Sequence, residues 1–209
     1  MKHYILMADI IGSSAKDQKK LMQDFKLLAQ DVNENFKQSI ISPLTITLGD
    51  EFQCILNDLQ TAIIIIISIE EYIIAKQLKF NLRYVLNYGL IETPINSIIA
   101  YEMLGKGLTD ARSILENSKG ENNRFFITID NKLQNQLLTN TFVLLENIIE
   151  NWNVEKDFEI LSNFITYQDY KIVAKNIGKT RSQVWKREKS LNIKGYNAAK
   201  NILELIPQI

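Results

Sequence analysis

The sequence contains very few cysteine, histidine and proline residues. Its 209 residues include one cysteine, Cys54, one histidine, His3, and three prolines. A single cysteine excludes an internal disulfide and a multi-cysteine zinc site. A single histidine argues against a histidine-rich metal site and against a Ser-His-Asp triad. We expect Cys54 to be a small core residue and His3 to be structural or exposed.

Long hydrophobic runs are also missing. The longest extends from Ala62 to Ile69, whereas a helix needs roughly 20 apolar residues to span a bilayer. The short apolar stretch near the N-terminus is not followed by a small-residue cleavage site. Because the chain also has only one cysteine, it suits a reducing compartment. We therefore expect a cytoplasmic protein that does not bind membranes.

The composition is that of a folded protein whose charge is unevenly distributed. Hydrophobic residues make up 46% of the chain and charged residues 23%, and the length suits one domain with a small second one. From residue 166 on there are nine basic and three acidic residues, a net charge of +6, which leaves 15 basic and 21 acidic residues before it. Such asymmetry suggests two modules with different partners, the basic one being a candidate for nucleic acid.

The first part of the chain alternates between strand and helix patterns. Apolar residues every second position indicate strands, and steps of three and four indicate amphipathic helices. Ser13 and Ser14 are expected to cap the first helix, and Gly89 to bend a strand. The expected elements are a strand at 3–12, a helix at 16–37, a hairpin at 42–56, a buried helix from Asp58 to 78, a strand at 80–92, a helix at 108–119, a strand at 124–130 and a helix at 130–152. This order predicts an α+β fold, a sheet covered by helices.

The rest of the chain shows no strand signal. Short helices are expected at residues 155–165, 167–176, 181–191 and 196–205. We place a domain boundary between residues 140 and 155, with a first domain at 1–145 and an all-α domain at 146–209.

Two aspartates sit at the ends of apolar strands. Asp9 comes near the end of the first strand, and Asp50 lies at the tip of the hairpin "TITLGDEFQCIL". If the two strands are neighbours, both carboxylates reach the same edge and repel each other unless a cation lies between them. Mg²⁺ usually takes one or two carboxylates and completes its shell with phosphate oxygens and water. The plain alternative is a turn at Gly49–Asp50 and a capping or solvated Asp9; Glu51 is expected to be a solvated hairpin residue.

The segment after Asp9 offers a second part of a nucleotide site. "IIGSS" is a turn of small residues that opens a helix, so backbone N–H groups there could bind a phosphate. The candidate residues in this turn are Ile10, Gly12 and Ser13.

These motifs resemble a known arrangement. "ADIIGSS" and "LGDEF" look like the paired metal motifs of class III nucleotidyl cyclases, whose palm domain has a ferredoxin-like sheet, and "LGDEF" also resembles the hairpin of diguanylate cyclases. "LRYVLNYGLIE" and "LGKGLTDARSILE" resemble a later cyclase strand and helix. The chain as a whole resembles the SatD family, a bacterial group with a cyclase-like N-terminal part and a DNA-binding-like tail.

The resemblance implies specific roles in nucleotide and metal binding. Asp9 and Asp50 match the metal positions, with Mg²⁺ expected and Mn²⁺ possible in its place. Gly49 and Arg112 join the turn residues as expected nucleotide contacts. The cyclase helix has an asparagine four residues before the arginine, and here that position is Leu108. The departure implies that the domain can bind a nucleotide without cyclising it; cyclases also complete the site across a dimer.

The basic tail contains the spacing of a helix-turn-helix. In "QDYKIVAKNIGKTRSQVWKREKSL", Ala174, Gly178 and Val184 are four and six residues apart. The alanine allows two helices to approach, the glycine makes the turn and the valine packs the second helix on the first. The segment resembles the helix-turn-helix of bacterial regulators, winged-helix-like or sigma-like. Trp185 is expected either to pack on the preceding helix or to lie against the DNA backbone.

The second helix of this motif would face double-stranded DNA. Its polar residue types suit phosphates and base edges in a major groove, and such proteins usually bind as homodimers to two half-sites. The expected DNA-binding residues are Lys179, Thr180, Arg181, Ser182, Gln183, Lys186 and Arg187. The alternative is a small helical docking domain with a solvated basic face.

Three functions follow from these observations. The first is a transcriptional regulator that binds DNA through its tail and senses a nucleotide with Mg²⁺ through its N-terminal domain. The second is a nucleotidyl cyclase-type enzyme with a helical accessory domain. The third is a non-catalytic dimerisation scaffold.

Overall fold

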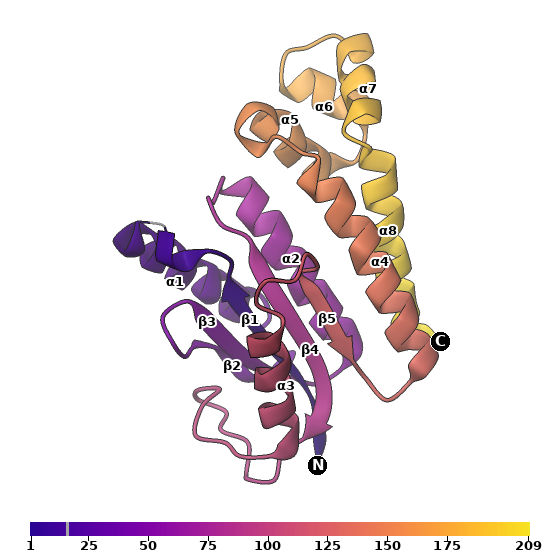
Figure 1. Ribbon diagram of the computed structural model, residues 1–209. Helices are drawn as coiled ribbons and strands as arrows, with labels where there is room; N and C mark the ends of the chain where they lie inside the picture. Colours follow the sequence, from indigo (N-terminus) through magenta and orange to yellow (C-terminus); the bar gives the residue numbers. More distant parts are fainter. Residues whose placement is uncertain (16) are drawn as a thin grey trace.

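The structure, a computed structural model, describes residues 1–15 and 17–209. Within these residues the chain forms a five-stranded mixed sheet surrounded by eight α-helices (Figure 1). The strand order is β2-β3-β1-β4-β5, with β4 and β5 parallel and the other neighbours antiparallel. The strands are β1 Lys2–Ile10, β2 Ile40–Ile46, β3 Glu51–Leu56, β4 Leu82–Leu90 and β5 Phe125–Thr128. The α+β class expected from the sequence is confirmed.

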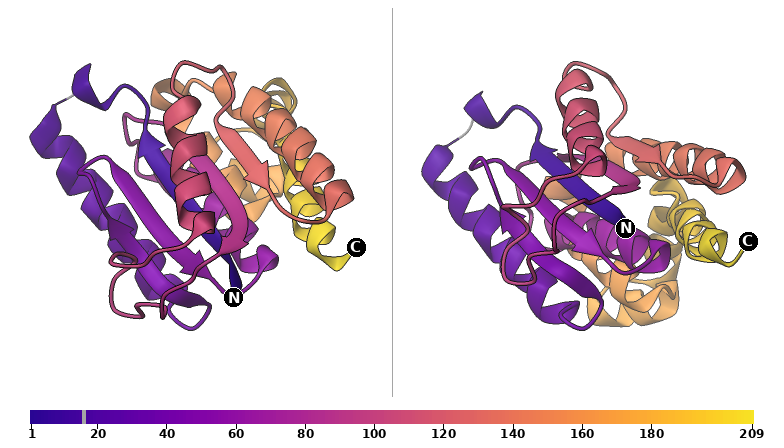
Figure 2. Two further views of the ribbon diagram at one scale, coloured as in Figure 1. Left: turned by 60° about the horizontal axis from the view of Figure 1, so that its bottom comes forward. Right: turned by 90° about the horizontal axis from the view of Figure 1, so that it is seen from below.

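The two faces of the sheet are covered by different helices. Alternate residues of a strand point to opposite faces, so Leu6, Ala8 and Ile10 of β1 pack in one hydrophobic cluster, while Ile5 and Met7 pack in another. The first cluster contains α1 and α2, and the second contains α3, which Figure 2 shows on the opposite side of the sheet. The helices are α1 Gln18–Asn35, α2 Leu59–Ala75 and α3 Lys106–Asn117.

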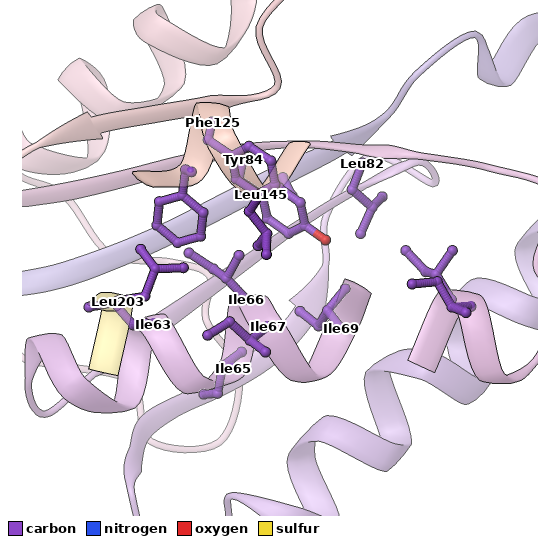
Figure 3. Close-up of a cluster of buried hydrophobic side chains, with 14 of the residues drawn as sticks. Ile63, Ile65, Ile66, Ile67, Ile69, Leu82, Tyr84, Phe125, Leu145 and Leu203 are labelled. Atoms are coloured by element: carbon purple, nitrogen blue, oxygen red, sulfur yellow. The ribbon is translucent and has the colours of Figure 1, made fainter. Parts of the chain in front are cut away.

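Helix α2 explains the unusual run of isoleucines. The helix begins next to Asp58, as the sequence predicted, and Asp58 caps it by accepting a hydrogen bond from Thr61 N at 2.7 Å. Its buried residues lie on nearly every side of the helix, which is the pattern of a helix enclosed by protein. Figure 3 shows isoleucine side chains of α2 next to the sheet residues Tyr84 and Phe125, with Leu203 from the C-terminal part of the chain close to Ile63. α2 is therefore sandwiched between the sheet and the tail.

The C-terminal helices return along the same core. They are α4 Lys132–Glu150, α5 Val154–Tyr167, α6 Tyr170–Asn176, α7 Arg181–Ser190 and α8 Ile193–Leu205. α4 runs across the expected boundary at residue 145, and α8 lies beside it and contacts α2 as well (Figure 1). Glu71 of α2 accepts hydrogen bonds from Tyr196 and Lys200 of α8. The tail and the sheet thus share one continuous hydrophobic core.

Two local expectations need correction. Ser13 belongs to a short 3₁₀ turn, Ser13–Ala15, and Asp17 caps α1 by accepting hydrogen bonds from Lys19 N and Lys20 N. The carboxylate of Asp17, three residues after Ser14, replaces the expected serine cap; residue 16, where that helix was expected to start, lies outside the described residues. Gly89 lies within β4, where it allows close approach of Gly107.

None of the helices in the described part of the chain has both the length and the apolar content to cross a membrane.

Candidate functional site

A row of charged residues crosses three strands at the edge where β1 ends. Asp9 of β1 stands opposite Glu51 of β3 on one side and opposite Arg83 of β4 on the other. All three side chains are buried, and residues paired across antiparallel strands point to the same face. Because Met7 is on the α3 side of the sheet, Asp9 lies on that side as well.

Asp9 is held by an arginine. Arg83 Nη1 donates to both carboxylate oxygens of Asp9, at 3.0 and 3.2 Å. No role for Arg83 follows from the sequence alone, because its place opposite Asp9 depends on the pairing of β1 with β4. The guanidinium neutralises a carboxylate that would otherwise be buried without a counter-charge.

Glu51 is also ion-paired, which corrects the expectation of a solvated hairpin residue. Arg112 Nη1 of α3 donates to Glu51 Oε2 at 2.9 Å, and Lys119 Nζ lies 3.9 Å from Oε1. Only 6% of Glu51 is exposed, because α3 packs over the sheet and brings its arginine onto the end of β3. Arg112, the expected nucleotide contact, therefore joins the row of charges through Glu51.

Asp50 contacts the end of β1 through its backbone and the turn after β1 through its side chain. Its carbonyl accepts a hydrogen bond from Ile10 N at 2.9 Å, and its carboxylate accepts one from Ser13 Oγ at 2.5 Å. Gly49 has φ +84°, a left-handed conformation that glycine adopts without strain. The hairpin tip thus lies beside the end of β1, as expected, but Asp9 and Asp50 have different partners.

Burial dominates the electrostatics of Asp9. Desolvation raises the pKa of its carboxyl group above the usual range, the positive charges of Arg83 and Lys119 lower it, and the negative charges of Glu51 and Asp50 raise it again. The influence of both neighbouring acids places them within electrostatic reach of Asp9. Burial therefore outweighs the neighbouring cations in setting the pKa of Asp9.

The carboxylates at this edge of the sheet are too few to enclose a metal ion by themselves. No group of three or more His, Cys, Asp or Glu side chains in the described residues could hold a metal ion. A protein-only cation cage is thus absent there, whereas Mg²⁺ bound chiefly through phosphate oxygens and water needs one or two carboxylates. Of the two carboxylates expected to bind such an ion, Asp9 is bonded to Arg83 on the α3 side of the sheet, and Asp50 is bonded to Ser13 beside α1. Such an ion would polarise a bound phosphate.

Three of the five expected nucleotide residues, Ser13, Gly49 and Arg112, line two clefts, whereas Ile10 is buried in the core. One, of about 460 Å³, is lined by Ser13, Gly49 and Asp50 together with residues of α1. The other, of about 650 Å³, lies beside α3 and is lined by Arg112 and by apolar residues including Met103 and Leu104. Glu51 of the charged row follows Asp50, which lines the first cleft, and it is bonded to Arg112, which lines the second.

The backbone of the expected phosphate turn is partly occupied. Ile10 N donates to Asp50 O, and Ile11 N donates to Asn81 O, each at 2.9 Å. Gly12 has φ +66°, which turns the chain away from the sheet. Of the three expected turn residues, Ser13 is the one whose side chain meets a candidate metal ligand.

The two helices of the expected helix-turn-helix, α6 and α7, are joined by a short turn. Gly178 has φ +63°, and Ala174 and Val184 are buried, 2% and 0% exposed, as their spacing predicted. Thr180 caps α7 in a capping box with Gln183. The turn therefore forms in the way the sequence indicated.

The expected DNA-binding residues have two different environments. Thr180 and Gln183 bond to each other in the capping box, and Arg187 binds Asp157 of α5 and Ser190. Thr180 and Gln183 are nevertheless exposed, as are Lys179, Arg181, Ser182 and Lys186. Trp185, which was expected either to pack on the preceding helix or to lie against the DNA backbone, is exposed. Lys189, which was not among the expected residues, places its Nζ 3.9 Å from the centre of the Trp185 ring.

Comparison with known proteins gives one match. The family model described as "SatD family" matches residues 4–206, essentially the whole chain. No curated protein matches the sequence.

Proposed function

We propose that the chain, which belongs to the SatD family, is a cytoplasmic DNA-binding transcriptional regulator whose N-terminal domain senses a nucleotide together with Mg²⁺. The observation that carries the proposal is that one folded unit combines two features. One is the buried row of charged residues beside the turn that contains Ser13, and the other is the exposed basic helix α7. Proteins that bind DNA have such clusters of lysine and arginine on one face.

The strand order supports a palm-type N-terminal domain. Strands β2-β3-β1-β4 are antiparallel throughout, with the helical connections α1 and α2 on the same face. This is the ferredoxin-like arrangement implied by the cyclase resemblance. Asp9 and Asp50 then occupy the two metal positions of that arrangement.

The charge and placement of α7 support DNA binding. Arg181 and Lys186 are exposed on a helix that begins at a tight turn, and Figure 1 shows α7 at the opposite end of the molecule from the N-terminus. Positive side chains at such a helix surface bind DNA phosphates and release counterions. The winged-helix-like or sigma-like docking expected from the sequence is part of this proposal, as is a homodimer that binds two half-sites.

The space between the two regions gives a route for coupling. A cleft of about 770 Å³ is lined by Ile11, immediately beyond the end of β1, by Asn81 and by the α4–α5 connection including Trp152. A ligand that moves the end of β1 would change the packing at this cleft and shift the position of the tail.

Binding of duplex DNA at low salt tests the proposal. The wild type should bind a labelled duplex with a strong salt dependence, and Arg181→Ala with Lys186→Ala should weaken binding and reduce the salt slope. Lys26→Ala with Lys37→Ala removes the same charge from exposed positions outside the tail and serves as the matched control. Absence of wild-type DNA binding in 50 mM salt, about the lower end of the useful range, would overturn the proposal.

The sensing part is tested by thermal shift. ATP and GTP, each with Mg²⁺ or Mn²⁺, should raise the melting temperature of the wild type because a ligand that binds only the folded state stabilises it. Asp50→Asn should abolish the metal-dependent part of the shift. No stabilisation by any nucleotide and metal would favour the scaffold alternative.

The second candidate is a nucleotidyl cyclase-type enzyme. Its supporting observation is that Arg112 lines a cleft while bonded to Glu51, directly opposite Asp9. Mass spectrometry of the nucleotide products decides between sensing and catalysis. A cyclic product that disappears in Asp50→Ala would establish the enzyme.

A further inference from the structure

One stripe of α7 faces away from the protein. Successive residues of an α-helix are rotated by about 100°, so positions 182, 185, 186 and 189 share a face. Ser182, Trp185, Lys186 and Lys189 are all exposed. Val184 and Glu188, on the other side of the helix, are buried. This stripe is what a duplex lying on α7 would meet.

Several residues expected to read DNA already have hydrogen-bond partners within the chain. Gln183 Oε1 accepts hydrogen bonds from Thr180 N and Oγ1, at 3.0 and 2.9 Å, and Arg187 is paired with Asp157. Their polar atoms hold the start and the inner side of α7. The outward stripe, in contrast, consists of two lysines, a serine and a tryptophan.

Trp185 differs from the other tryptophan of the chain. Trp152 is 6% exposed and donates Nε1–H to Leu191 O at 2.7 Å, which is a structural role. Trp185 is 40% exposed, and no hydrogen bond from its indole is found in the described residues. The ammonium of Lys189 lies over its ring, 3.9 Å from the centre. This cation–π contact holds the ring in place on the helix surface.

We infer that Trp185 is a specificity-determining residue, contacting a thymine methyl group in the major groove while Lys186 and Lys189 bind phosphates. The inference rests on the proposed DNA binding. Lysine–phosphate contacts position a protein but carry no sequence information, whereas apolar contact with the C5-methyl group distinguishes thymine from the other bases. Trp185 is the one large apolar side chain on the stripe, and Lys189 fixes its orientation.

Selection from a random duplex pool tests the inference. Full-length wild type should enrich sites with thymine at a defined position. Trp185→Ala should keep its binding to non-specific duplex and its salt slope while that preference falls by about 5- to 150-fold, the range for one base pair in a specific site. Circular dichroism melting checks that the variant folds, which is expected because the side chain is exposed.

Replacing the selected thymine by uracil removes only the methyl group. Wild type should bind the uracil duplex more weakly than the thymine duplex, while Trp185→Ala should bind the two equally. Lys189→Met should weaken the methyl discrimination less than Trp185→Ala, because it leaves the ring present. Equal binding of both duplexes by wild type, or an unchanged preference in Trp185→Ala, would overturn the inference. Absence of any wild-type DNA binding would instead overturn the proposed function.

Discussion

At the residue scale, the central feature is a set of buried acids that have arginine partners. Asp9 and Glu51 are adjacent across two strands, and their charges are offset by Arg83 and Arg112. A buried charge pair contributes little net stability, but loss of one partner leaves the other uncompensated. Removing one of these arginines should therefore cost more stability than the ion pair itself contributes.

Removing Arg83 should strongly destabilise the protein. Arg83→Leu leaves Asp9 buried without its counter-charge and should lower the free energy of unfolding by about 3–5 kcal/mol. Lys119→Leu is the control, because Lys119 is half-exposed and lies 3.9 Å from Glu51, so its loss should cost less than about 1 kcal/mol. Urea unfolding measures both, and similar losses in the two variants would contradict the burial argument.

A second buried cluster should make stability depend on pH. Arg124 binds Glu70 and Glu146, giving two acids to one arginine. Burial raises the pKa of Glu146, and the charges of Glu150 and Glu70 raise it further. The charge of Arg124 and a hydrogen bond from its backbone lower this pKa, but the net result is an increase above the ordinary value of 4.5. Since the folded state holds this proton more tightly than the unfolded state, the contribution is fully present below pH 4.5 and is lost as pH rises through the folded-state pKa.

Glu146→Gln isolates this effect. The variant cannot titrate, so its free energy of unfolding should fall less than that of the wild type between pH 4.5 and neutrality. Urea unfolding at several pH values measures the difference. Glu121→Gln, at an exposed position, should follow the wild-type curve. Parallel curves for wild type and Glu146→Gln would show that the carboxyl group does not titrate differently on folding.

At the scale of elements, the packing of α3 on β4 positions the site. A Cβ at Gly107 would lie 2.5 Å from the carbonyl carbon of Gly89, and one at Gly89 would lie 2.4 Å from Gly107 Cα. The two glycines thus let helix and strand backbones touch. This close contact holds α3 near the sheet, so that Arg112 can reach Glu51.

Gly107→Ala should push α3 away from the sheet. Overpacking of this kind costs about 1–3 kcal/mol, which should exceed the helix-propensity gain of about 1 kcal/mol from replacing a helical glycine. Thermal unfolding measures the loss, and Glu116→Ala, at an exposed position in α3, should be nearly neutral. An increase in stability for Gly107→Ala would show that the backbones can separate without cost.

At the scale of the whole molecule, the tail is an integral part of the fold. α2 is enclosed by the sheet on one side and by α5 and α8 on the other, and Trp152 bonds to the end of α7. Shared apolar burial couples the unfolding of the two regions. We therefore expect one cooperative transition despite the two functions proposed.

A matched pair of valines tests this expectation. Val32 lies in α1 and Val184 in α7, and they are 2% and 0% exposed. Val32→Ala and Val184→Ala should each lower stability by about 1–3 kcal/mol and shift the whole urea transition, followed by circular dichroism and by tryptophan fluorescence. Two separate transitions, with Val184→Ala affecting only one, would show that the tail unfolds independently.

The sequence pattern determined the elements and several local contacts. Periodicity identified most strands and helices, the length of the isoleucine-rich segment identified a helix starting near Asp58, and the spacing of Ala174, Gly178 and Val184 identified the turn before α7. These features depend on residues close together in the chain, so local propensity and patterning are sufficient to read them. The α+β class follows from their order.

The tertiary structure alone decided how the charges are paired. Arg83 reaches Asp9, and Arg112 reaches Glu51, across many intervening residues, so neither pair leaves a local sequence pattern. Burial of Glu51 requires α3 to pack over the hairpin, and exposure of Trp185 follows from which side of α7 meets the core. Such contacts depend on strand register and helix packing, which arise from the cooperative burial of the entire apolar surface.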